Sequence, residues 1–311
     1  MNSNLTIQQL ISTFLAQKDI AATSRKTYRS TLGSFFRWMV DKKYTARKPK
    51  REQIIEYKAY LIQVKKSDAT SNLYLNSLKS FFSWLEESKI YPNVAGKIKA
   101  PKRYQGFKKQ RLSIDQLNYL LNSIERNTLK EQRDYSMILL AFTNGLRTVE
   151  LSRLLIENID TVLMKAHIQR KGDLYPMQWL PITKECLNSI SQYIQSRIDA
   201  GEEITNNSHL FVSNVIGRNS NPLSAQEVGA IISKRLKAAG LHSKTVTAHS
   251  LRHSAASYLL ESGWSVYEVQ KFLGHKSVTT TELYLKTADL VNMHNEKPQE
   301  TLSKMLQKIE A

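Results

Sequence analysis

Apolar residues recur every three or four positions through most of the chain, and this spacing predicts a mainly helical protein. In the first ninety residues, each periodic segment has one apolar face and one polar face, as helices that share a core do. We expect four helices here, one beginning after Thr6 and the others spanning 24–40, 51–64 and 69–87.

Two of these predicted helices carry the same aromatic motif. Ser34-Phe35-Phe36-Arg37-Trp38 in the second is matched by Ser80-Phe81-Phe82-Ser83-Trp84 in the fourth. Rows of aromatic side chains at helical spacing are more often core than platforms on which bases stack. We therefore expect these rows to form the packing seam of a small helical bundle.

Beyond residue 112 the helical spacing continues, but one patch of short strands interrupts it. The segments 156–159, 163–169 and 178–182 predict three strands, the last two joined by a turn at Lys171-Gly172-Asp173. Ser113 and Thr148 are expected to cap helices over 115–124 and up to Leu154. Further helices are expected over 133–143, 183–198, 224–239, 250–260, 266–272, 279–286 and 300–309. The predicted fold class is mainly α with a small antiparallel β-sheet.

The 311 residues are enough for two domains, and proline and glycine mark the boundary between them. Pro92, Gly96, Pro101 and Gly106 interrupt any regular helix between residues 92 and 111. We expect a helical domain over 1–91, an extended linker over 92–111, a second domain over 112–290 and a C-terminal tail over 291–311.

Positive charge is concentrated in the first third of the chain. The chain has 45 Lys and Arg against 27 Asp and Glu, a net charge of +18. Residues 1–111 hold 23 of the basic and 7 of the acidic residues, so they carry +16 of this excess. This imbalance favours a nucleic-acid partner whose phosphates are neutralised without reading of the bases. The candidate DNA-binding residues are Arg25, Lys26, Arg29, Lys79, Lys102, Arg103, Lys108 and Lys109.

Other features exclude several classes of protein. The longest apolar run, 137–142, is far shorter than the roughly 20 residues that span a membrane. The first residues lack the basic start and apolar stretch of a signal peptide. The chain has a single cysteine, Cys186, which excludes an intrachain disulfide and a cysteine-rich zinc site. Cys186 lies four residues before Ile190 in a predicted helix, and this helical spacing predicts a core position. We expect a protein of the reducing cytoplasm, with no membrane partner.

Three segments carry residues of catalytic type. The first, Thr143 to Leu151, contains Arg147 and Glu150. The second is His249-Ser250-Leu251-Arg252-His253, and the third is Leu273-Gly274-His275 followed nine residues later by Tyr284. Each segment is weak by itself. In this order and spacing, together with Gly263, Thr279 and Thr280, they resemble the boxes of the tyrosine recombinase (phage integrase) family, and more the short Xer- and resolvase-like members than those with an added arm-binding domain.

The resemblance implies a site-specific DNA recombinase with an N-terminal helical core-binding domain and a catalytic domain. Such an enzyme cleaves and rejoins DNA through a 3′-phosphotyrosine and a Holliday junction, to integrate, excise or resolve a mobile element or replicon. It needs no metal ion and no cofactor. Its partners are double-stranded DNA with paired recombination sites and three further copies of the chain, in a homotetramer on DNA. Accessory DNA-bending or directionality proteins are a further class of partner.

The catalytic residues implied by the resemblance are Arg147, Lys171, His249, Arg252, His275 and Tyr284. Planar guanidinium groups suit the extra charge of a phosphorane-like transition state. Tyr284 is the expected nucleophile, and His249 its proton acceptor. Lys171 is the expected acid for the leaving 5′ oxygen, and His275 is expected to donate to the phosphate. Glu150 is expected to orient the site without reacting.

The predicted hairpin departs from the family pattern. Pro181 follows Lys171 by ten positions, which is longer than usual, and Gln178 stands where a basic residue is common. Arg170 is therefore a second candidate for the acid.

Three other functions compete with recombination. A type IB topoisomerase would share the chemistry but only relax DNA. A DNA-binding regulator with decayed catalytic residues would bind without cleaving, although all six candidates are present. A metallohydrolase could use His242, His249, His253 and His275, but no carboxylate accompanies them at ligand spacing.

Overall fold

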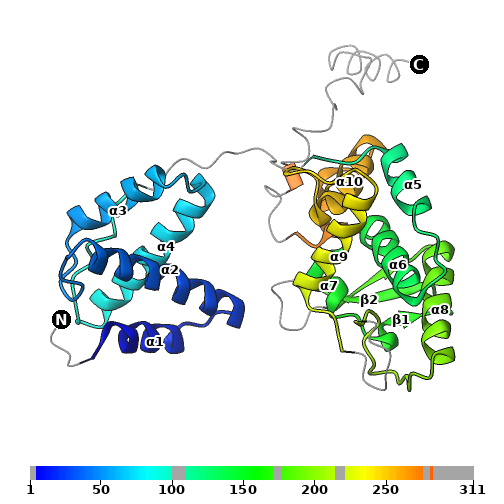
Figure 1. Ribbon diagram of the computed structural model, residues 1–311, viewed down its shortest axis with the longest axis horizontal. Coiled ribbons are helices and arrows are strands. Elements are labelled where there is room, and N and C mark those ends of the chain that lie inside the picture. Colours follow the sequence, from blue (N-terminus) through cyan, green and yellow to red (C-terminus); the bar gives the residue numbers. More distant parts are fainter. Residues whose placement is uncertain (1–4, 100–109, 171–176, 214–220, 276–280, 283–311) are drawn as a thin grey trace, which may run out of the picture. The chain divides into compact units, whose positions relative to one another are not determined.

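The computed structural model describes residues 5–99, 110–170, 177–213, 221–275 and 281–282, and it divides the chain into two compact units (Figure 1). The division falls between residues 105 and 106. No helix in these described ranges has the length and apolar character needed to cross a membrane.

The described part of the first unit is built from α1 (Ile7–Gln17), α2 (Ala22–Asp41), α3 (Arg51–Gln63) and α4 (Asp68–Glu87). Their bounds lie close to those predicted from the apolar spacing. Thr6 and Gln9 form a capping box at the start of α1, in which each side chain bonds the backbone N–H of the other. Ser67 caps α4 in a similar way by accepting from the N–H of Thr70.

The aromatic rows of α2 and α4 form the core of the first unit, as predicted. Phe35, Phe36, Phe81 and Phe82 are all buried. The Phe36 and Phe81 rings lie edge to face with centroids 6.0 Å apart, and Phe14 of α1 meets Phe81 at 5.4 Å. Such tilted pairs are favoured by the ring quadrupole, so the repeated motif is a packing seam and not a stacking surface.

The segment predicted as a linker is anchored at both ends. Ala95 and Ile98 are buried in the core of the first unit, and Lys58 Nζ donates to the Lys99 carbonyl at 2.8 Å. At the other end, Gln110 N donates to the Thr245 carbonyl at 3.0 Å and Arg111 forms an ion pair with Glu261. Residues 100–109, with the predicted DNA contacts Lys102, Arg103, Lys108 and Lys109, lie outside the described residues.

Helix α6 (Leu129–Thr143) is the central element of the second unit (Figure 1). All its residues from Arg133 to Ala141 are buried, because other helices pack around it. The helices of this unit, among the residues described, are α5 (Ile114–Asn122), α6, α7 (Thr148–Ser152), α8 (Lys184–Asp199), α9 (Ala225–Ala238), α10 (Ala248–Glu261) and α11 (Val266–Leu273).

A small antiparallel sheet lies beside these helices, in the order β1 (Ile159–Asp160), β2 (Lys165–Gln169) and β3 (Met177–Pro181). Ala166 pairs with Leu180 and points into the core, whereas His167 pairs with Trp179 on the opposite face. These two rings stack with centroids 4.4 Å apart. The alternation follows the two-residue period of a strand, and the sheet confirms the predicted fold class.

Three predicted details were wrong, and each has a local cause. Helix α6 begins four residues earlier than expected, since Thr128 and Glu131 form a capping box. Arg147, not Thr148, is the N-cap of α7, because its backbone N–H is held by the Glu150 carboxylate. Most of the segment predicted as the first strand is a 3-10 turn over Ile156–Asn158.

Cys186 is fully buried in α8, as predicted, and burial raises the pKa of its thiol. Other predicted elements lie outside the described residues: the turn at 171–173, the tail helix at 300–309 and most of the helix at 279–286, of which Thr281 and Glu282 are helical.

Candidate active site

A sharp turn after α6 begins the candidate site. Gly145 adopts a left-handed conformation with φ of 57°, and a Cβ there would lie 2.5 Å from Leu273 Cδ2. Only glycine fits this turn without displacing Leu273. The chain therefore reverses at Asn144-Gly145 and places Arg147 at the start of α7.

Glu150 is the hub of the site. Its carboxylate accepts from Arg147 Nη1 at 2.7 Å and from Arg170 Nη1 at 3.3 Å, and it lies 3.9 Å from Arg252 Nη1. We call Arg147, Arg170 and Arg252 the arginine cluster. The Glu150 side chain is 0% exposed. Burial raises its pKa, but the Arg147 N–H bond and the three guanidinium charges outweigh burial, so the pKa lies below its ordinary value.

Arg252 joins two turns of the chain from inside α10. One Nη donates to the Gly145 carbonyl and the other to the Leu273 carbonyl, the latter at 2.8 Å. Its side chain is 1% exposed. The Arg252 guanidinium therefore bonds both the turn before Arg147 and the end of α11 before His275. These bonds fix the positions of the two segments relative to one another.

Arg170 follows β2 and is also buried. Its Nε donates to Gln178 Oε1 at 2.9 Å, and Nη2 donates to the Phe272 carbonyl. Gly274 lies directly against it: a Cβ at that position would come 2.8 Å from Arg170 Nε. The guanidinium thus bonds the opposite strand of the hairpin, the hub carboxylate and the last turn of α11.

The two candidate histidines lie on different elements within electrostatic reach of one another. His249 is exposed in the first turn of α10, whereas His275 follows α11 and is buried. His275 Nδ1 lies 2.8 Å from Thr281 Oγ1. Burial, reinforced by the charges of Arg252, Arg147, His249 and Arg170, lowers the pKa of His275 to about 3, so the ring is neutral near pH 7.

Exposure distinguishes the members of the arginine cluster. The Arg147 side chain is 21% exposed, while the Arg170 side chain is 5% exposed. Three cations around one carboxylate leave an excess of positive charge beside two histidines. Such an arrangement can bind a phosphate and stabilise additional negative charge on its oxygens.

The structure brings together Arg147, Glu150, His249, Arg252 and His275, which the sequence placed in three separate segments. Lys171 and Tyr284 lie outside the described residues. The second candidate for the acid, Arg170, is described, and its location contradicts that role. Its Nε and both Nη groups donate to protein acceptors, and the side chain is buried.

Two contributors were not predicted. Arg170 was not expected to pair with Glu150, and Thr281 was not expected to meet His275, since Thr279 and Thr280 were the threonines assigned to that box. The sequence held one clue to the location of Arg170. Position 178 has Gln in place of the basic residue common in the family, and the structure shows that Gln178 accepts a hydrogen bond from Arg170. No signal in the sequence distinguished Thr281 from its neighbours.

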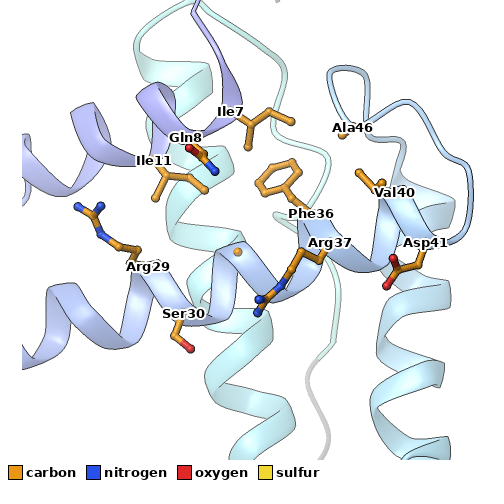
Figure 2. Close-up of a pocket in the computed structure, with 11 residues that line it drawn as sticks. Ile7, Gln8, Ile11, Arg29, Ser30, Phe36, Arg37, Val40, Asp41 and Ala46 are labelled. Atoms are coloured by element: carbon orange, nitrogen blue, oxygen red, sulfur yellow. The ribbon is translucent and has the colours of Figure 1, made fainter.

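Four of the predicted DNA-binding residues are described, all in the first unit. Arg25, Lys26 and Arg29 are exposed on α2, and Lys79 is half-buried on α4. Figure 2 shows Arg29 and Arg37 beside a hollow between α1 and α2 that is lined mainly by apolar side chains. Its volume is about 530 Å³, and none of the proposed catalytic residues lines it.

Among the residues that the structure describes, no three His, Cys, Asp or Glu side chains are grouped so that they could hold a metal ion. His242, His249, His253 and His275 therefore do not assemble as the metallohydrolase alternative requires. His253 is buried in α10, with Nδ1 3.3 Å from Ser257 Oγ.

Comparison with known proteins assigns both units. Residues 110–290 match the phage integrase family, and residues 7–89 match the N-terminal SAM-like domain of phage integrases. Tyrosine recombinase XerD of Listeria innocua is 28% identical over 292 residues, covering 92% of this chain and 95% of that protein. XerD of Staphylococcus aureus is 27% identical over 248 residues, covering 79% of this chain and 82% of the relative.

Solved structures share the fold at lower identity. A XerH site-specific recombinase bound to a palindromic difH substrate superposes with a TM-score of 0.70 and 21% identity, over 90% of this chain and 81% of that one. A lambda integrase dimer bound to a COC′ core site gives a TM-score of 0.67 and 18% identity, over 90% and 95% of the two chains.

Proposed function

The chain belongs to the phage integrase family of tyrosine recombinases, and from this premise we propose that it is a site-specific DNA recombinase whose nucleophile is Tyr284. The observation that carries the proposal is the arginine cluster around Glu150, with His249 and His275 beside it. Neither DNA relaxation alone nor regulation without catalysis is favoured, because the matched relatives are recombinases.

In the proposed reaction the Tyr284 oxygen attacks a DNA phosphorus, and the bond from phosphorus to the 5′ oxygen breaks. The electron pair of that bond goes to the 5′ oxygen, and the phosphate remains joined to the tyrosine as a 3′-phosphotyrosine. The bond energy is thereby conserved for rejoining. Attack by a free 5′ hydroxyl from the second DNA reverses these steps and yields a Holliday junction.

Arg147 and Arg252 stabilise the charge that develops on the non-bridging oxygens. Arg147 is the more exposed and donates to these oxygens directly, whereas Arg252, whose two Nη groups also bond the Gly145 and Leu273 carbonyls, acts mainly through its positive charge. The hydrogen bond from Arg147 Nη1 to Glu150 fixes the guanidinium before DNA arrives, so less ordering is needed in the transition state. Glu150 remains ionised because its pKa is depressed, and it therefore acts as an anchor and not as a base.

The histidines have separate roles. His249 is exposed at the start of α10 and accepts the Tyr284 proton. His275 is neutral with its Nδ1 facing the Thr281 hydroxyl, so a proton on Nε2 is the one it can donate to the phosphate. Lys171 gives its proton to the leaving 5′ oxygen.

The basic first unit positions the DNA through its phosphates, using Arg25, Lys26, Arg29 and Lys79 on α2 and α4 and Lys102, Arg103, Lys108 and Lys109 further along the chain. Four protomers act on two sites, with accessory DNA-bending or directionality proteins where the host process needs them. The tail at 291–311 docks on a neighbouring protomer and couples the active sites. The work is done on the nucleoid, in the cytoplasm.

The proposal is tested by recombination in vitro. The target site is first recovered by selection from a random duplex library, and two copies are then placed on one supercoiled plasmid. We expect deletion or inversion between the copies, in EDTA as well as in magnesium, and no effect on a plasmid without them. Relaxation of the control plasmid without exchange would support the topoisomerase alternative, and loss of cleavage in EDTA would contradict the metal-free reaction.

A further inference from the structure

We propose that Arg170 is a positioning residue that holds the chain at the base of the hairpin so that Lys171 can protonate the leaving group. This inference rests on the proposed function, in which Lys171 is the acid. Arg170 is the last described residue at the β2 end of the hairpin, and it stands immediately before Lys171 in the sequence.

Three directed hydrogen bonds fix Arg170. Nε donates to Gln178 on β3 at 2.9 Å, Nη1 donates to Glu150 at 3.3 Å, and Nη2 donates to the Phe272 carbonyl. These acceptors belong to three elements: the hairpin, α7 and α11. A guanidinium presents its donors in a rigid plane, so bonds to three acceptors determine its position and its orientation.

The surroundings of Arg170 leave little space for another arrangement. Its side chain is buried, and Gly274 lies so close that a Cβ would come 2.8 Å from Nε and 2.9 Å from Cδ. Gly274 has φ of 63° and directly precedes His275. The packing of the arginine against Gly274 thus joins the base of the hairpin to the residue before a proposed phosphate donor.

Arg170 and Arg147 also share the Glu150 carboxylate. Arg170, the residue before the proposed acid, and the proposed phosphate-binding Arg147 are therefore held by the same carboxylate. Because proton transfer requires contact between donor and leaving oxygen, a small displacement at residue 170 slows protonation more than it weakens binding of DNA.

The test compares two leaving groups. In a nicked DNA substrate, the 5′ oxygen at the cleavage position is replaced by sulfur. A thiol has a pKa of about 8.5, far below that of an alcohol, so the sulfur leaves as a thiolate with little help from an acid. A variant that lacks acid catalysis recovers on the sulfur substrate, whereas a variant that is misfolded or binds DNA poorly is impaired on both.

We expect Arg170→Gln to slow cleavage of the oxygen substrate by about 100-fold or more, the usual contribution of a positioned acid, and cleavage of the sulfur substrate by less than about 10-fold. Arg170→Lys keeps the charge but not the three-way geometry and should show the same selective loss. Gln178→Ala removes one of the three acceptors of Arg170 and is the milder change, so its selective loss of cleavage on the oxygen substrate should be smaller. Arg153→Gln, an exposed arginine after α7, is the matched control and should leave both rates unchanged.

Lys171→Ala separates failure of this inference from failure of the proposed function. If sulfur rescues Lys171→Ala but not Arg170→Gln or Gln178→Ala, then Lys171 is the acid and the positioning role of Arg170 is overturned. If sulfur does not rescue Lys171→Ala, the acid assignment itself fails, and the role of Arg170 fails with it. Rescue of all three variants, with wild-type DNA binding in a gel shift, supports the inference.

Discussion

Arg147 and Glu150 are joined by two hydrogen bonds that begin α7. The Glu150 carboxylate accepts from the Arg147 backbone N–H at 2.9 Å and from the Arg147 guanidinium at 2.7 Å. A capping interaction, which normally only starts a helix, here also orients a side chain of the active site. Local folding of α7 and the geometry of the proposed phosphate contact therefore depend on the same carboxylate.

Glu150→Gln should impair both stability and cleavage. The amide keeps the shape of the side chain but leaves the arginine cluster without its buried counter-charge. We expect the free energy of unfolding to fall by about 3 kcal/mol, measured by denaturant unfolding, and covalent cleavage of a nicked substrate to fall with it.

Glu227→Gln is the matched control, because Glu227 forms the same type of capping box on α9 but is not buried. It should cause a much smaller loss of stability and none of cleavage. Equal losses from both substitutions would mean that Glu150 is only a cap.

Stability should depend on pH through His275. The pKa of His275 in the folded state, about 3, lies below its ordinary value of 6.5, so between these values the unfolded chain binds a proton that the folded chain does not. The neutral, buried His275 therefore favours the folded state fully above pH 6.5, and this contribution to the free energy of unfolding is lost as the pH falls towards 3. Unfolding midpoints measured from pH 7.5 to 4.5 should therefore fall less steeply in His275→Gln than in the wild type. A parallel dependence in the two proteins would contradict a buried, neutral His275.

The Glu150 carboxylate contributes to the pH dependence of stability over a lower pH range than His275 does. Its folded pKa is depressed, so its stabilising effect is present above the ordinary pKa of 4.5 and is lost as the pH falls through the folded value. In Glu150→Gln, the loss of stability relative to wild type should consequently be largest near neutral pH and shrink below about pH 4. A difference that stays constant down to pH 3 would indicate a steric and not an electrostatic cause.

Gly274→Ala should be more destabilising than Gly240→Ala. Both glycines have positive φ, 63° and 69°, so both substitutions bear the cost of a left-handed alanine, about 1–2 kcal/mol. At Gly240 nothing lies within 4 Å of the new Cβ, whereas at Gly274 it collides with Arg170. Thermal unfolding should show the larger shift for Gly274→Ala, with a selective loss of cleavage. Equal shifts would mean that Arg170 moves freely.

Replacing Arg25, Lys26 and Arg29 together by Gln should weaken DNA binding and flatten its salt dependence. For every phosphate that the protein no longer neutralises, the slope of log K against log salt becomes shallower by about 0.9. The control removes the same charge from exposed lysines of the second unit, Lys130, Lys184 and Lys237. Binding titrations at several salt concentrations should show the larger change in slope for the α2 variant. The reverse order would place the phosphate-binding residues elsewhere.

The elements of the fold were predictable where side chains mark them locally. Thr6, Ser113 and the aromatic rows of α2 and α4 indicate helix starts and a core through local spacing alone. The early start of α6 and the cap of α7 were missed, and in both a Glu side chain reaches back to a backbone N–H. Thr128 and Glu131 have the same spacing as Thr6 and Gln9, so the start of α6 was marked in the sequence and was overlooked because the apolar positions begin later. The cap of α7 has no such signal, because arginine is not a residue type that caps helices through its side chain.

The candidate site was predictable as a set of residue types but not as a network. The three motifs identify Arg147, Glu150, His249, Arg252 and His275, yet no spacing shows that one carboxylate joins three arginines from α7, the end of β2 and α10. Arg170 illustrates the limit most clearly. As a basic residue beside Lys171 it suggests a substitute acid, and only its burial and its three acceptors reveal a different location.

The central claim is covalent catalysis by Tyr284, and trapping the DNA adduct tests it most directly. A nicked substrate that loses its short 5′ fragment after cleavage is incubated with wild type, Tyr284→Phe and the control Tyr267→Phe, whose ring is exposed on α11. On a denaturing gel we expect the covalent adduct with wild type and Tyr267→Phe. Tyr284→Phe should give none, although it still shifts DNA in a native gel. An adduct that persists in Tyr284→Phe and disappears in Tyr258→Phe or Tyr267→Phe would contradict the account.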